Sequence, residues 1–183
     1  MTETFDNIEY LKSGTERQKQ AYSVLTENEV LQKLKPFSPI LVGTIPINID
    51  IESSDLDIIC YWKDKNDFIS HLKKTFCGES NFEIRENQSR NSVVANFILQ
   101  DFEIEIFGQN IPVKEQFAYQ HLIIENNLLR KKGDDFRTQI IELKKQGYKT
   151  EPAFAAALGL TGNPYIELLS FENSQSIFYN KLH

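Results

Sequence analysis

The chain has 183 residues, 40% of them hydrophobic and 25% charged, which is ordinary for a globular protein with one sizeable core. Its formal net charge of −6 argues against non-specific binding to nucleic acid, because such binding depends on neutralising phosphates with basic side chains. No run of about eighteen apolar residues is present, so the sequence predicts no membrane span. The acidic, polar N-terminus does not have the pattern of a signal peptide.

Several common kinds of site lack their local signature in this sequence. Cys60 and Cys77 have neither metal-ligand spacing nor a secretory context, which predicts reduced thiols in a cytoplasmic protein. No Ser-His-Asp or Cys-His set has a recognisable signature, and no Walker-type glycine loop or zinc spacing is present. Carboxylates are therefore the side chains that remain as candidates for catalysis.

The N-terminal part, residues 5–35, is predicted to be helical. Thr15 with Gln18, and Thr26 with Glu29, both fit the capping box, in which the side chains at the N-cap and at the third helical position bond to each other's backbone N–H. Apolar residues recur at helical spacing after each box, and Pro36 ends the second helix. Two consecutive helices are therefore expected before the first strand.

The middle of the chain predicts strands around one helix. Ile40 to Gly43 is a short buried strand and Ser54 to Trp62 its neighbour, and the alternation of apolar residues from Ile45 to Ile51 predicts an extended segment between them. Asp64 to Phe76 has apolar residues at intervals of three and four, which is typical of an amphipathic helix.

Three more strands follow, with short polar turns between them that indicate an antiparallel meander: Asn81 to Glu86, Ser92 to Leu99, and Phe102 to Phe107. In the last of them Glu103 and Glu105 share one face, and the apolar residues share the other. Either glutamate alone is equally explained as a solvated residue on a sheet strand.

After Pro112 the pattern is helical: Lys114 to Lys132, a helix containing Phe136 and Leu143, one capped by Thr150, and a short one from Asn163. The chain from Asn173 on is predicted to be irregular. Three aromatic residues are expected in the core: Phe117, Phe136 and Phe154. The predicted fold class is α/β (α+β), with a mixed, largely antiparallel sheet and flanking helices in residues 1–112, and a helical part, residues 113–183, packed on it as one compact unit.

The stretch from Leu41 to Ile58 has the residues expected for a metal and phosphate site. On a strand, Asp55 and Asp57 point to the same face, and two strand residues span roughly 6.6 Å. This spacing allows the pair to flank one divalent ion, or two ions about 3.5–4 Å apart. Gly43 and Thr44 provide close backbone approach and hydroxyl and N–H donors for a phosphate. The alternative is a turn leading into a strand that begins with solvated aspartates.

At these residues the sequence resembles the nucleotidyltransferase superfamily related to DNA polymerase beta. The matching elements are Val42-Gly43-Thr44, a gap of about ten residues, and Ser54-Asp55-Leu56-Asp57-Ile58. Thr44 stands where Ser is usual and keeps the hydroxyl. The chain also resembles a small group of uncharacterised bacterial proteins of this superfamily, which have a minimal nucleotidyltransferase domain. That likeness is carried by Tyr10-Leu11, Gly43-Thr44-Ile45-Pro46, Ser54-Asp55-Leu56-Asp57, Ile104-Glu105-Ile106-Phe107-Gly108-Gln109, Pro112-Val113-Lys114-Glu115-Gln116, Thr150-Glu151-Pro152-Ala153-Phe154 and Pro164-Tyr165.

The resemblance implies a nucleotidyltransferase-type sheet and a set of site residues. Asp55, Asp57 and Glu105 would be catalytic and would ligate Mg²⁺ or Mn²⁺, with Glu105 favoured over Glu103 as the third carboxylate because of the segment around it. Gly43, Thr44 and Ser54 would bind the nucleotide phosphates.

A triphosphate also calls for a cation, and Lys114, Arg85 and Arg90 are the candidates; the alternative for each is an ordinary surface charge. His121 and Glu125, four residues apart on one helix, could contact each other or form a minor metal site, but His121 shares its stripe with Phe117 and Ile124, which favours a buried histidine whose hydrogen bonds are satisfied. Gln116 and Tyr119 are candidates for a base or acceptor pocket.

The sequence therefore supports two functions. The first is a metal-dependent enzyme that transfers a nucleoside monophosphate from a nucleoside triphosphate to an unknown small-molecule or protein acceptor and releases pyrophosphate. The second is a non-catalytic nucleotide-binding or protein-interaction member of the same fold, such as an antitoxin.

Overall fold

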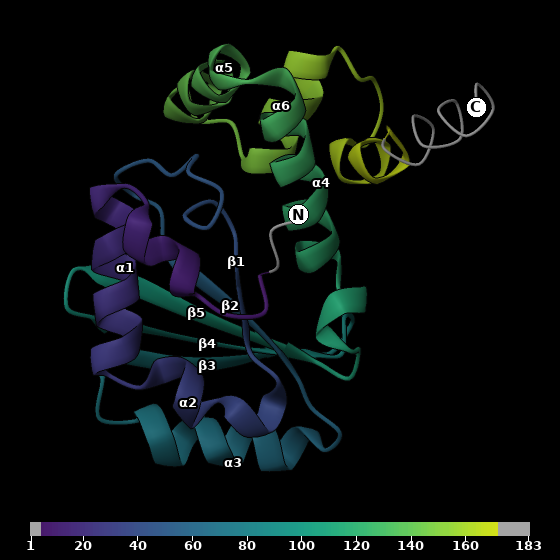
Figure 1. Ribbon diagram of the computed structural model, residues 1–183. Coiled ribbons are helices and arrows are strands. Elements are labelled where there is room, and N and C mark those ends of the chain that lie inside the picture. The colour runs from purple at the N-terminus through teal and green to yellow at the C-terminus, as the bar shows by residue number, and fades with distance from the viewer. Residues whose placement is uncertain (1–4, 172–183) are drawn as a thin grey trace. The chain divides into compact units, whose positions relative to one another are not determined.

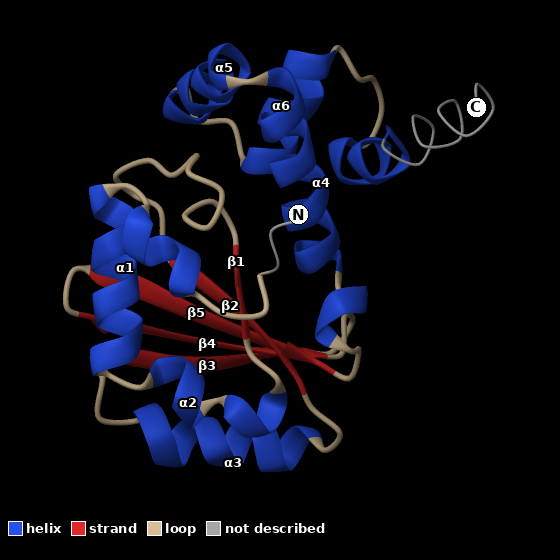
Figure 2. Ribbon diagram, in the orientation of Figure 1, coloured by secondary structure: helices blue, strands red, loops and turns tan. Residues whose placement is uncertain are grey.

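A computed structural model describes residues 5–171, which divide into two compact units. The first unit contains the chain up to Asn48 and Ser53–Gln116, and the second contains Ile49–Glu52 and the chain from Phe117 on. The first unit is built on a sheet, and the second is helical (Figures 1 and 2).

The sheet has five strands in the order β1-β2-β5-β4-β3. Their bounds are β1 Ile40–Val42, β2 Leu56–Tyr61, β3 Ser80–Asn87, β4 Ser92–Leu99 and β5 Phe102–Gln109. β3, β4 and β5 form the predicted antiparallel meander, β1 is antiparallel to β2, and β2 is parallel to β5. The prediction of a mixed, largely antiparallel sheet with flanking helices is therefore confirmed. The one parallel pair joins two strands that are far apart in the sequence.

The helices of the first unit are η1 Glu9–Ser13, α1 Glu16–Glu27, α2 Val30–Lys33, η2 Lys35–Phe37 and α3 Lys65–Phe76. The first predicted capping box is confirmed, because the Thr15 and Gln18 side chains each bond to the backbone N–H of the other. The second is wrong: Thr26 lies inside α1, and Glu29 precedes α2 in a left-handed conformation with no side-chain cap. The break between the two helices therefore lies at Asn28 and Glu29, after the position that the capping-box pattern indicates.

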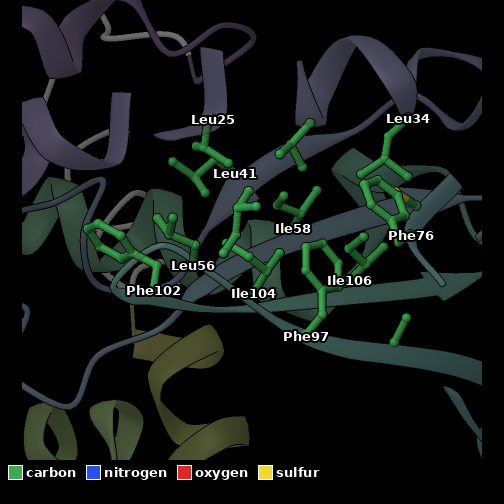
Figure 3. Close-up of a cluster of buried hydrophobic side chains, with 14 of the residues drawn as sticks. Leu25, Leu34, Leu41, Leu56, Ile58, Phe76, Phe97, Phe102, Ile104 and Ile106 are labelled. Atoms are coloured by element: carbon green, nitrogen blue, oxygen red, sulfur yellow. The ribbon is translucent and has the colours of Figure 1, made fainter. Parts of the chain in front are cut away.

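A hydrophobic core joins one face of the sheet to these helices (Figure 3). Alternate strand residues point into it, such as Leu56 and Ile58 of β2 and Ile104 and Ile106 of β5, as period-two alternation requires. The residues between them, including Asp57 and Glu105, point to the opposite face. The strand alternation therefore separates the packing face from the face that has the carboxylates.

The segment after Gly43 is not extended as predicted. Residues 45–48 form a turn, in which the Asn48 N–H donates to the Ile45 carbonyl oxygen at 3.2 Å and Asn48 has φ of +56°. Ile45 and Ile47 are nevertheless buried. Burial of alternate apolar residues is compatible with a compact turn when the chain packs over the core, so the alternation misidentified the local conformation.

The second unit contains α4 Phe117–Lys132, α5 Asp134–Lys145, α6 Thr150–Leu158 and a helical segment at 164–171, while the 3₁₀ helix η3 Val113–Glu115 closes the first unit. All four helices were predicted, but Thr150 is the first residue of α6 and not its cap. No helix in residues 5–171 is long and apolar enough to cross a membrane. The prediction for the chain from Asn173 on lies outside the described residues.

The aromatic residues of the second unit divide into two kinds. Phe136 and Phe154 are buried with their rings 5.8 Å apart and edge to face, which confirms their predicted place in the core. Phe117 is 70% exposed, so its predicted core position is wrong. It begins α4, and a residue in the first helical turn has fewer neighbours to cover it than one further along the helix.

Candidate functional site

The carboxylates that the sequence singled out lie on the face of the sheet opposite the core, where β2 and β5 run in parallel. Asp57 is the direct cross-strand partner of Glu105, and both side chains are half-buried. Asp55 precedes the first residue of β2 and is close enough for its negative charge to raise the pKa of Glu105. The parallel pairing thus gathers three acidic side chains on one face.

Glu103 and Glu105 differ in their surroundings. Glu103 is exposed and pairs with Ile98 of β4, whereas Glu105 lies between Asp57 of β2 and Asn96 of β4. Glu105 is therefore the glutamate in the interior of the sheet. Which of the two is a ligand stays a prediction.

Gly43 lies against one of these carboxylates. It has φ of +79°, and a Cβ built on it would lie 2.2 Å from Oδ2 of Asp57. β1 and β2 pair Val42 with Asp57, so the chain turns away from the sheet directly beside the carboxylate. A side chain at residue 43 would be strained in this conformation and would collide with Asp57. The sequence suggested glycine for close approach to a phosphate; the structure adds that it leaves room for Asp57.

Two hydroxyl groups connect the two parts of the signature segment, residues 42–58, across the gap between Thr44 and Ser54. Thr44 Oγ1 donates to Ser54 Oγ at 3.2 Å, and Ser54 directly precedes Asp55. This contact brings the predicted phosphate-binding residues, ten positions apart in the sequence, next to the first carboxylate.

Burial raises the pKa of Glu105, and the negative charges of Asp55 and Glu103 raise it further. A hydrogen bond from the Asn96 side chain and the positive charge of Arg85 act in the opposite direction. Arg85 Nη2 also donates to Oδ1 of Asn96 at 2.7 Å, which turns the amide nitrogen of Asn96 toward Glu105. Asn96 was missed at the sequence level, because only strand pairing reveals that it is the neighbour of Glu105.

The carboxylates provide the right donors for a hard divalent cation without forming a closed cage. Asp and Glu oxygens are the ligands that Mg²⁺ and Mn²⁺ prefer. Within residues 5–171, however, no three His, Cys, Asp or Glu side chains converge in an arrangement that could hold a metal ion. The donor set fits the ion, and the side chains would have to turn toward one another to ligate it.

The three side chains predicted as triphosphate-binding cations, Lys114, Arg85 and Arg90, have different partners. Lys114 forms an ion pair with Asp6 at 2.6 Å, beyond the end of β5, and Arg90 contributes a carbonyl oxygen to which Gln109 donates. Of the three candidates, Arg85 is the one whose charge acts on Glu105.

Gln116, a pocket candidate, is buried and donates to the carbonyl oxygens of Cys60 and Ile111, both at 2.9 Å. Its amide therefore holds backbone in place. Tyr119, the other pocket candidate, is half-buried on α4 of the second unit.

His121 in the second unit is a buried histidine with partners. Its Nδ1 lies 3.3 Å from Oε1 of Glu151, and its Nε2 is 3.0 Å from the Tyr165 carbonyl oxygen. Burial lowers its pKa, but the hydrogen bonds to Glu151 and Tyr165 outweigh that effect and leave the pKa raised. Glu125, predicted as a possible partner, is 4% exposed and its Oε1 has no hydrogen-bond partner.

Replacing Glu125 with Gln is expected to stabilise the protein at neutral and alkaline pH. Burial raises the pKa of Glu125 well above its usual value, as does the charge of Glu151, while Lys144 opposes the shift. The folded state therefore holds the proton more tightly, and stability is lost as pH rises from the unfolded-state pKa toward the folded one. The loss is about 1.4 kcal/mol per pH unit between the two, and Gln removes it.

The measurement is the unfolding free energy of wild type and Glu125→Gln from pH 4 to pH 8. The advantage of the variant should grow with pH, and Glu142→Gln, at an exposed glutamate of α5 that pairs with Lys145, is the control for removing a surface carboxylate. His121 and Glu151 are present in both proteins, so the difference reports Glu125 together with its charge coupling to Glu151. A difference independent of pH would contradict the assignment.

Comparison with solved structures identifies the fold. Three structures of the Cid1 poly(U) polymerase are similar to this chain: a mutant bound to MgATP, with a TM-score of 0.56 at 12% identity, a form bound to Mg 3′-dATP, at 0.54 and 11%, and a form bound to MgGTP, at 0.53 and 12%. The matches cover 76%, 71% and 69% of this chain, which spans 48%, 41% and 41% of the respective polymerase chains. The likeness establishes a nucleotidyltransferase fold.

Sequence comparison is less informative. The family model described as "Domain of unknown function (DUF4269)" matches residues 23–171. No curated protein is significantly similar to the chain.

Proposed function

The chain belongs to the DUF4269 family, whose description assigns no activity, and we propose that it is a metal-dependent nucleotidyltransferase. It would transfer a nucleoside monophosphate from a nucleoside triphosphate to an acceptor and release pyrophosphate. The observation that carries this proposal is the cross-strand pair Asp57–Glu105, with Asp55 beside it and the Gly43 turn in contact with Asp57. The fold of the polymerase structures supports it, although a fold by itself does not decide function.

In this proposal Asp55, Asp57 and Glu105 hold Mg²⁺ or Mn²⁺. The ion, when bound, would neutralise charge developing on the transferred phosphoryl group and lower the pKa of the attacking hydroxyl. Asn96 orients Glu105 and, by favouring the ionised form, keeps it available as a ligand. Thr44 and Ser54 provide hydroxyl donors for the phosphates beside the backbone of Gly43.

The acceptor is proposed to be a small molecule or a protein side chain. The solved relatives are described as poly(U) polymerases, but this chain spans under half of their length. Its net charge of −6 disfavours non-specific contact with a nucleic-acid backbone.

The experiment that tests the proposal is thermal unfolding with each nucleoside triphosphate, with and without Mg²⁺ or Mn²⁺. A ligand at a hundredfold excess over its dissociation constant stabilises the folded state by about 2.7 kcal/mol. A metal-dependent rise in Tm with one nucleotide would support the enzyme and identify the donor. If no nucleotide raises Tm, the proposal fails, and a lysate pull-down would test the non-catalytic, antitoxin-like alternative.

A matched pair of variants tests whether Glu105 or Glu103 is the third metal-binding carboxylate. Glu105→Gln is expected to lose most of the metal-dependent rise in Tm, because it removes the charge opposite Asp57. Glu103→Gln, two residues away on the same face, should keep that rise, since its side chain is exposed and pairs with Ile98. The reverse result would make Glu103 the third carboxylate.

A further inference from the structure

An arginine on α1 contacts the signature segment without being part of it. Arg17 lies in the first turn of α1, and its Nη2 donates to the Ser54 carbonyl oxygen at 3.2 Å. Its Cζ lies 3.8 Å from the centroid of the Phe102 ring, at the start of β5. The hydrogen bond and the cation–π contact fix the plane of the guanidinium beside the residue that precedes Asp55.

The positive charge of Arg17 has no counter-ion among residues 5–171. Its Nε is buried and has no hydrogen-bond partner, and no described carboxylate lies within ion-pair distance of its guanidinium. The guanidinium is always charged and carries five N–H donors, of which one is used here. Arg17 is half-buried, and withdrawing its Nε donor from water without a partner costs free energy. The chain has 26 acidic residues, so a shortage of carboxylates does not explain why none lies beside Arg17.

Gln18, the next residue, shows that the first turn of α1 contacts the signature segment at two places. Gln18 Nε2 donates to the carbonyl oxygens of Ile45, at 2.8 Å, and Pro46, at 3.3 Å. The second place is Ser54, whose carbonyl oxygen accepts the hydrogen bond from Arg17. The first turn of α1 is therefore placed where the two predicted phosphate-binding positions meet, at the Thr44–Ser54 hydroxyl contact.

We propose that Arg17 is the cation that binds the triphosphate tail of the nucleotide at the Thr44–Ser54 contact. An oxyanion would give the guanidinium the counter-ion that the protein does not provide, and the planar fork suits two phosphate oxygens at once. The inference rests on the proposed function, because it names the phosphate contact of the same site. Residue 17 lies outside the 23–171 range of the family model, so that match assigns it no role.

The test uses inorganic triphosphate in metal-free buffer, which probes the anion contact without the carboxylates or a base. Arg17→Met keeps an unbranched stem over Phe102 and is expected to weaken binding at least tenfold, the value of about one charge-assisted hydrogen bond. Lys19→Met is the matched control, because Lys19 lies on the same turn but forms an exposed pair with Glu16 at 2.7 Å. Calorimetric titration gives the affinities, and circular dichroism checks folding.

The inference is overturned if wild type does not bind triphosphate, or if Arg17→Met binds it as wild type does. Should Arg17→Met not fold, Arg17→Lys replaces it, with weaker binding expected from loss of the fork and equal binding counting against the inference. If Arg17 binds triphosphate but no nucleotide raises Tm with metal, the anion site stands and the proposed function fails.

Discussion

Asp57→Asn is expected to abolish metal-dependent nucleotide binding and leave the fold intact. Asn has nearly the same shape as Asp, so it fits beside Gly43 and keeps the β2 backbone pairing with Val42 and Glu105. It removes the central negative charge of the carboxylate set, and a neutral amide oxygen is a much weaker ligand for a hard divalent ion. The expected loss is the full stabilisation by nucleotide, about 2.7 kcal/mol at a hundredfold excess over the dissociation constant.

Thermal unfolding with the nucleotide that stabilises wild type, with and without metal, measures this loss. A stabilisation of that size corresponds to roughly 5–10 °C in Tm for a chain of this length. Asp101→Asn, in the exposed turn between β4 and β5, is the control and should shift like wild type. If Asp57→Asn keeps the metal-dependent shift, the assignment of the site is wrong.

Gly43→Ala is expected to lower stability and to displace the Asp57 carboxylate. The left-handed conformation at φ +79° costs a residue with a Cβ about 1–2 kcal/mol. The added methyl group would also lie 2.2 Å from Oδ2, 3.1 Å from Cγ and 3.3 Å from Cβ of Asp57, so the carboxylate has to move. The variant should therefore have a Tm several degrees below that of wild type. It should also lose the rise in Tm that nucleotide causes in the presence of metal.

Gly159→Ala is the matched control for the backbone. Gly159 ends α6 in the left-handed conformation, with φ of +67°, and a Cβ built on it has nothing within 4 Å, so its loss of stability reports the conformational cost without a collision. The greater loss at Gly43 measures the collision, and a double-mutant cycle with Asp57→Ala should remove that excess. Equal losses at the two glycines, with nucleotide binding intact, would show that Gly43 is required only for its conformation.

Much of the local structure follows from the sequence. The alternation of residues 92–99 and 102–107, with a short turn between them, predicted the meander, and helical spacing in residues 64–76 predicted α3. These patterns are reliable because burying one face of a strand or helix imposes its own period on the residues. The Asp55-Leu56-Asp57 triplet likewise predicted two carboxylates on one side of a strand.

Where local signals compete, the sequence alone was not enough. The capping-box pattern at Thr26 describes a helix start, yet Thr26 lies in the last turn of α1, and the next helix begins at Val30 without a side-chain cap. The alternation after Gly43 is compatible with a strand or with a turn whose apolar residues are buried, and the turn forms. In both cases packing of the surrounding chain outweighs a local preference of about 1 kcal/mol.

The sequence by itself determined most of the helices and strands and the acidic pair Asp55 and Asp57. Only the tertiary structure decided that β2 runs parallel to β5, which sets Glu105 opposite Asp57 and Asn96 beside Glu105. Only the tertiary structure brings Arg17 to Ser54, across 37 positions of the chain. The physical reason is that periodicity records which face of an element is buried, whereas the partners on its other face depend on strand pairing and helix placement, which no local pattern specifies.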